Sequence, residues 1–227
     1  MTRCCAAACP IIELEQTYAL GAITFEATER IELKKQTATA FVHDMICAFA
    51  FDDCVLPEGL NWLDATTRGA LEAKIRAAGF AADFGQQLII DVHALGAGNA
   101  EVPHYVMLIG LGGGFAAEGT LRIPRTIPQT LCSSGGAIAQ AVSDLQVTEL
   151  SIDFGGLARH NINLLGMAGL LRCRLAIEIN RLMLDLDTVK VICDRSELPL
   201  VRFGLAQEQQ LCPICSSPTF GTEAQIS

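Results

Sequence analysis

A glycine-rich segment that follows a predicted strand carries the strongest chemical signal in this sequence. Gly110, Gly112, Gly113 and Gly114 come directly after the unbroken apolar run at 105–109. Glycine lets a backbone approach a ligand closely, and its N–H groups can bind phosphate, more so beside a helix N-terminus. The spacing matches neither G-x-G-x-x-G nor G-x-x-x-x-G-K. The segment therefore predicts either binding of a nucleotide or ADP-ribose-type ligand, or a plain strand-to-helix turn.

Four further residues are candidates to contact such a ligand. They are Asn99, Phe115, Ser133 and Ser134, which flank the glycines in the sequence. In open α/β sheets, ligands bind beyond the carboxyl ends of the strands, which is where this segment falls. No G-x-S-x-G motif surrounds the two serines, so helix packing is the alternative interpretation for them.

The terminal cysteines form a second group with possible chemistry. Cys212 and Cys215 make one C-x-x-C pair, which supplies at most half of a tetrahedral zinc site. Cys4, Cys5 or Cys9 could complete that site if the chain termini meet. A thioredoxin-like redox pair requires a strand–helix context, and this pair lies among prolines and serines. Zinc is therefore a possible cofactor, and the alternative is that these terminal cysteines form no site. No other cofactor is predicted.

The remaining polar residues predict no catalytic site. None of the four histidines forms H-x-x-x-H or H-E-x-x-H. Asp91 and His93 are two apart on a predicted strand, so we expect them to share one face as a surface pair. Arg122, Arg125 and Arg159 could form a small anion site, with separately solvated charges as the alternative.

Composition restricts the class of protein. The chain has 227 residues, of which 51% are hydrophobic and 18% charged, typical of a well-filled globular core. The net charge of −9 argues against a general nucleic-acid or membrane-surface binder. No apolar run reaches the roughly 18 residues of a spanning helix, and the first ten residues do not resemble a secretory signal. We expect a cytoplasmic protein with reduced cysteines, of which Cys47, Cys132, Cys173 and Cys193 should be buried.

Apolar periodicity predicts alternating strands and helices. Strands are expected at 19–25, 30–33, 45–51, 87–95, 105–109, 147–153 and 188–193, and helices at 63–78, 127–145 and 164–184. Asp64 or Thr66 should cap the first helix and Gly79 should end it, whereas Asn161 or Asn163 should cap the last. That last helix is apolar on too many sides for one contact, so we expect neighbours on more than one side.

These elements predict an α/β fold with three layers and a mixed, mostly parallel sheet. The segment from 102 to 153 reads strand, helix, strand, which is a βαβ unit and requires parallel strands. We expect one domain at 11–195, preceded by a loose tail at 1–10. From residue 196 the periodicity fades, and 196–227 is expected to be an irregular tail that contains the C-x-x-C pair.

Several local strings, in this order, resemble the N-terminal domain of the leucyl aminopeptidase family. They are G-F at 79–80, G-Q-Q-L-I-I at 85–90, V-M-L-I-G-L-G at 106–112, G-G-A-I-A-Q-A at 135–141 and G-L-L-R at 169–172, with a closing strand at 189–193. The resemblance extends over about residues 61–194. It implies a macro-domain-like fold, which in those enzymes supports assembly of the hexamer and performs no chemistry.

The sequence also departs from that family. The catalytic string N-T-D-A-E-G-R-L, which supplies two metal-ligand carboxylates, does not occur in it. Where the enzymes carry charged residues after G-L-G, this chain has Gly113, Gly114 and Phe115. The resemblance therefore implies a non-catalytic domain that acts in homo-oligomer assembly or in binding another protein. The alternative is a binder of a nucleotide or ADP-ribose-type small molecule at 110–114.

Overall fold

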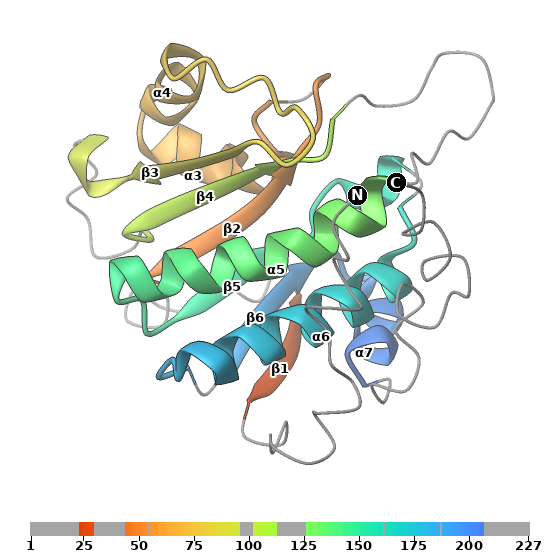
Figure 1. Cartoon of the computed structure of the whole chain (residues 1–227). Helices are drawn as coiled ribbons and strands as arrows, with labels where there is room; N and C mark the ends of the chain where they lie inside the picture. Colours follow the sequence, from red (N-terminus) through yellow and green to blue (C-terminus); the bar gives the residue numbers. More distant parts are fainter. Residues whose placement is uncertain are drawn as a thin grey trace, which may run out of the picture.

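The structure is a computed structural model of the chain (Figure 1). It describes residues 23–29, 44–53, 55–95, 102–112, 126–160, 162–186 and 188–206. The predicted tail at 1–10, the predicted strand at 30–33 and residues 207–227 lie outside this described part.

A six-stranded sheet forms the centre of the fold, in the order β1-β6-β5-β2-β4-β3. Its strands are β1 (Thr24–Glu29), β2 (Met45–Ala50), β3 (Gln87–Asp91), β4 (Tyr105–Gly110), β5 (Leu150–Asp153) and β6 (Thr188–Cys193). All neighbouring pairs are parallel except β3 and β4, which are antiparallel. The mixed, mostly parallel sheet predicted from the sequence is therefore confirmed.

Helices cover both faces of the sheet, which gives the three predicted layers (Figure 1). On one face lie α3 (Asn61–Thr66) and α4 (Ala70–Ala77); on the other lie α5 (Thr126–Leu145), α6 (Leu164–Leu182) and α7 (Leu198–Ala206). Strand β2 is buried along its whole length and supplies both cores. Ile46 and Ala48 join the α3–α4 core, whereas Cys47 and Phe49 join the other. This two-sided burial explains the unbroken apolar sequence of β2.

The βαβ prediction is confirmed with one refinement. Strand β4, helix α5 and strand β5 follow one another, and β4 and β5 run in the same direction. They are not neighbours, however, because β2 lies between them and pairs with both. The connection through α5 therefore passes over β2.

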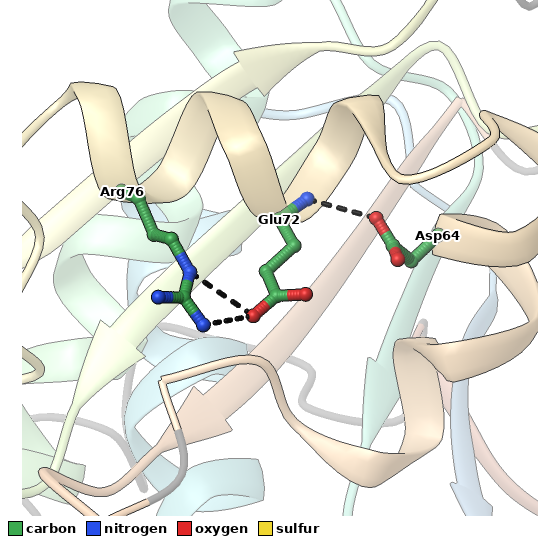
Figure 2. A network of polar contacts seen from close by, with 3 residues as sticks. All are labelled: Asp64, Glu72 and Arg76. Carbon is green, nitrogen blue, oxygen red and sulfur yellow. Dashed lines mark hydrogen bonds and ion pairs between the residues drawn. The ribbon is translucent and has the colours of Figure 1, made fainter.

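The helix predicted at 63–78 is two helices, which corrects that prediction. Arg68 and Gly69 both adopt positive φ angles, of 55° and 82°, and this breaks the chain between α3 and α4. Asp64 belongs to α3 but caps α4, because its Oδ1 accepts the Glu72 N–H at 2.8 Å (Figure 2). Gly79, at φ 65°, ends α4 as predicted. Glu72 also pairs with Arg76 one turn later (Figure 2).

Two strand predictions were too long at their ends. The strand predicted at 87–95 stops at Asp91, and a 3₁₀ turn, η4 (His93–Leu95), follows. The strand predicted at 147–153 begins only at Leu150. The backbone N–H groups of Thr148 and Glu149 instead donate to the Asp44 carboxylate, so they are not available to a ladder.

The prediction of an irregular chain at 196–227 was wrong for residues 198–206, which form α7; for 207–227, outside the described residues, it stays a prediction. Gly204 allows α7 to cross α6 in close contact, because a Cβ there would lie 2.4 Å from the Leu165 carbonyl oxygen. Helix α6 thus has neighbours on several sides, as its sequence predicted, with α5 on one side and α7 on another. Asn163 caps α6 by accepting the Gly166 N–H at 3.2 Å.

No helix within the described ranges combines the length and apolar character needed to cross a membrane.

Asp44 joins the amino ends of β2 and β5. Its Oδ2 accepts the hydroxyl and the N–H of Thr148, both at 2.7 Å, and the Glu149 N–H at 3.1 Å. Partial burial, the largest single effect, would raise the pKa of this carboxyl. The hydrogen bonds from Thr148 and Glu149 together outweigh that effect and lower the pKa below its ordinary value of 3.8.

We therefore expect Asp44→Asn to destabilise the fold in a pH-dependent way. Because the folded-state pKa is lowered, the carboxylate stabilises the fold above about pH 4 and loses this contribution as the pH falls through the folded-state value. The difference in free energy of unfolding between wild type and variant, from urea titrations, should be about 1 kcal/mol near neutral pH and should shrink below about pH 4. Asp185→Asn, at an exposed aspartate, is the matched control. A difference independent of pH would contradict this account of Asp44.

Candidate functional site

The sheet has a topological switch point between β2 and β5, and this is the candidate site. From β2 the chain leaves toward α3 and α4 on one face; from β5 it leaves toward α6 on the other. The two strands are parallel neighbours, so their carboxyl ends lie side by side while their continuations diverge. In open α/β sheets such a divergence opens the crevice in which ligands bind.

Two contacts join the segments that leave β2 and β5. The rings of Phe51, after β2, and His160, after β5, stack with centroids 3.7 Å apart and planes 19° from parallel. Arg159 forms an ion pair with Glu58, at 2.6 Å from Nη1 to Oε2. Both charged side chains are substantially exposed, so this pair contributes little stability, and an anion could compete for Arg159. The switch point thus carries an aromatic stack beside an exposed charged pair.

Asp153 ends β5 directly beneath these contacts. It is buried, and its Oδ1 accepts the Gly155 N–H at 2.7 Å, which holds the first turn after the strand. The buried Cys47 lies on the neighbouring strand. Burial first, and then the nearby Asp153 charge, raise the pKa of the Cys47 thiol well above its ordinary value. Cys47 is therefore a protonated, unreactive core residue rather than a nucleophile.

The burial predicted for the other core cysteines is confirmed for Cys173 and Cys193. The side chain of Cys132 lies outside the described part of the structure.

Gly110 is required by packing between neighbouring loops. A Cβ at this position would lie 2.1 Å from the Asp83 carbonyl oxygen, which no side chain tolerates. Its N–H donates to the Gln86 carbonyl at 2.8 Å, and its carbonyl accepts the Gly85 N–H at 2.9 Å. The backbone of Gly110 thus completes the β3–β4 edge.

Gly112, two residues further along the chain, also packs against the segment before β3. It has φ 79°, and a Cβ would lie 2.5 Å from the Phe84 ring. Its N–H donates to the Ala82 carbonyl at 2.8 Å. In this structure the N–H groups of Gly110 and Gly112 therefore bind the chain itself. Gly113 and Gly114 lie outside the described residues, and phosphate binding by them stays a prediction.

Ser133 and Ser134 lie in α5, in the part of the helix that packs on α6. Ser134 is buried and Ser133 is exposed. The two glycines that follow give room to Arg174 of α6, because a Cβ at Gly135 would lie 2.8 Å from the Arg174 Cγ. Arg174 in turn pairs with the buried Glu178. Packing against Arg174 accounts for Gly135, and a ligand contact by the serines stays a prediction.

The expected Asp91–His93 pair needs correction. Asp91 Oδ1 lies 3.9 Å from Nε2 of His104, not beside His93, because the strand ends at Asp91 and a 3₁₀ turn begins. His93 instead stacks on His104, with centroids 4.4 Å apart. This cluster lies at the amino end of β4, opposite the candidate site. Arg122 and Arg125 lie outside the described residues, and Arg159 is paired with Glu58.

The remaining candidates also lie outside the described part. These are Asn99 and Phe115 of the ligand prediction, and Cys4, Cys5, Cys9, Cys212 and Cys215 of the zinc prediction. Within the described ranges, no three His, Cys, Asp or Glu side chains are grouped so that they could hold a metal ion. The zinc hypothesis therefore stays a prediction.

Sequence reasoning missed the two contacts at the switch point. His160 and Arg159 belong to no motif, and their partners lie about a hundred residues earlier in the chain. A weaker signal was available, because Gly155 and Gly156 come one residue after a predicted strand and Gly156 has φ 83°. A glycine pair in that position marks a turn at the carboxyl edge of a sheet.

Comparison with known proteins identifies the fold. No protein-family model matches the sequence, and no curated protein does. Among solved structures, the macro domain of ganglioside induced differentiation associated protein 2 matches with TM-score 0.58 and 9% identity, over 81% of this chain and 82% of that one. A Trypanosoma brucei macrodomain in complex with ADP-ribose matches with TM-score 0.51 and 14% identity, over 81% and 68% of the two chains.

A mutant tomato leucine aminopeptidase matches with TM-score 0.52 and 16% identity. The match covers 80% of this chain but only 35% of the aminopeptidase, so the chain spans about a third of that enzyme's length. At these identities the likeness establishes a fold and nothing finer. The chain has a macrodomain-like α/β fold, and its likeness to part of an aminopeptidase agrees with the resemblance seen in the sequence.

We expect Gly110→Ala to destabilise the protein by about 3 kcal/mol or more, because its Cβ would overlap backbone atoms of residues 82 and 83. Gly85→Ala is the matched control: Gly85 has φ 72°, but nothing lies within 4 Å of its Cβ position. It should lose only about 1 kcal/mol from backbone strain. Urea unfolding measures both values. Equal losses would show that the close approach of the two loops does not determine the need for Gly110.

Proposed function

We propose that this chain is a non-catalytic, macro-like domain that acts in oligomer assembly or protein interaction. The observation that carries the proposal is the placement of its exposed large apolar side chains. Ile89 is 42% exposed on the edge strand β3, and Leu200 and Phe203 are 51% and 60% exposed one turn apart on α7. Residues at this spacing share one helix face, so the last two form a small continuous apolar surface.

The state of the glycine segment favours this function over ligand binding. The N–H groups of Gly110 and Gly112 donate to Gln86 and Ala82, so they are not available to a phosphate. The likeness to part of an aminopeptidase supports the same proposal, because the sequence lacks the N-T-D-A-E-G-R-L string that the family's catalytic part carries.

The assembly function predicts a stable oligomer whose subunit number is indifferent to nucleotides. Native mass spectrometry and sedimentation velocity of the freshly purified full chain should report one defined oligomer, unchanged by added ADP or ADP-ribose. The same spectra report bound zinc, which tests the predicted cysteine site. A monomer at every concentration would exclude homo-oligomer assembly.

A second candidate function is binding of a nucleotide or ADP-ribose-type ligand at the switch point. The observation that favours it is the aromatic stack of Phe51 and His160 at this edge, beside Arg159. Aromatic rings can stack on a nucleobase, and a guanidinium can bind a phosphate. The solved macrodomain structure that holds ADP-ribose shares the fold.

This candidate predicts that ADP-ribose raises the melting temperature, because a ligand that binds only the folded state stabilises it by mass action. At about a hundred times Kd the gain is about 2.7 kcal/mol. His160→Ala should reduce the shift, whereas His93→Ala, at the opposite edge, should leave it unchanged. If neither ADP nor ADP-ribose shifts the wild-type melting temperature at millimolar concentration, the candidate is excluded.

A further inference from the structure

Within the described residues, strand β3 is an edge of the sheet with little protection against pairing, because Asp91 at its end is its only charged residue. In the described part of the structure its only sheet neighbour is β4. Edge strands are normally protected by lysine, proline, a bulge or inward charge. The sequence of β3, Q-L-I-I-D, contains neither lysine nor proline, and Ile89 at its centre is 42% exposed. The opposite edge, β1, differs because it carries Glu26 and Glu29.

The ladder with β4 shows which backbone groups of β3 point outward. Gly110 N–H donates to the Gln86 carbonyl, and Val92 N–H donates to the His104 carbonyl. Bonded residues alternate along an antiparallel ladder, so the even-numbered residues face β4. The N–H and C=O groups of Gln87, Ile89 and Asp91 therefore face away from it.

We propose that a second copy of this chain pairs with β3 through a two-fold axis at Ile89, which joins the two sheets. In this antiparallel register Ile89 lies opposite its own counterpart, and Gln87 lies opposite Asp91 of the second copy. These are the three residues with outward backbone groups, so all three opposed pairs are hydrogen-bonded pairs. The proposal rests on the assembly function and specifies its surface and its partner.

The side chains fit the same register. Ile89 packs on Ile89 of the second copy, on the sheet face shared with Met107. The Gln87 amide can donate to the Asp91 carboxylate, and this register places no like charges directly opposite each other. A two-fold contact uses the same strand on both copies and therefore closes at a dimer. Pairing of β3 with β1 of another copy would instead propagate into an open array.

Site-specific disulfide formation tests the register directly. Opposed residues of a hydrogen-bonded pair have Cα atoms about 5.5 Å apart, within the range that a disulfide requires. Under mild oxidation of the full chain, Ile89→Cys should give a peptide linked through position 89 of both copies, identified by peptide mass mapping. Gln87→Cys is the matched control, because its two copies would lie about 14 Å apart and should not link.

A second pair of variants separates this inference from the assembly function. Ile89→Lys places a charge on the outer edge without touching the β4 ladder, and it should abolish the dimer in sedimentation velocity. Met183→Lys, at an 88% exposed position just after α6, should leave the dimer intact. If the wild type is an oligomer that Ile89→Lys does not dissociate, or if Gln87→Cys links to itself, the proposed β3 contact is wrong and assembly uses another surface. A wild-type monomer over the whole concentration series excludes both the β3 contact and homo-oligomer assembly.

Discussion

Strand β2 is the constraint on which the rest of the structure depends. All six of its residues are buried, and it pairs with β4 on one side and β5 on the other. Its side chains alternate between the two cores, as do those of its neighbour β4. Asp44 fixes the amino end of this strand to β5, and Phe51 contacts the segment after β5 at the other end. Strand β2 and the contacts at its two ends therefore tie both cores to β5.

The same strand determines where a functional site can form. Because the chain leaves β2 and β5 toward opposite faces, the crevice of the sheet falls between them. In this protein the crevice is bridged by the chain's own side chains, through the Phe51–His160 stack and the Glu58–Arg159 pair. Any ligand there would have to use or displace these contacts. The glycine segment beside it is held by the 82–86 loop, so packing explains its composition as far as Gly112.

Much of the fold could be predicted from the sequence because the signals are local. The apolar runs predicted β2, β4 and β6, and Gly79 and Asn163 marked helix ends correctly. The predictions failed where the decisive contact is distant or the backbone is unusual. The helix at 63–78 breaks at Arg68, a residue type that rarely has positive φ, and α7 depends on Gly204 meeting α6. The contacts at the candidate site join segments about a hundred residues apart, and no spacing rule reveals them.

The antiparallel strand β3 forms one edge of the sheet in the described part of the structure. A further parallel strand would need a crossover connection. Strand β3 instead follows α3 and α4 and pairs antiparallel with β4, and residues 82–86, just before it, approach Gly110 at the end of β4. This approach sets which residues of β3 hydrogen-bond to β4. As a result, the backbone N–H and C=O groups of Gln87, Ile89 and Asp91 face away from β4. The glycine that first suggested a ligand site thus helps to define the sheet edge.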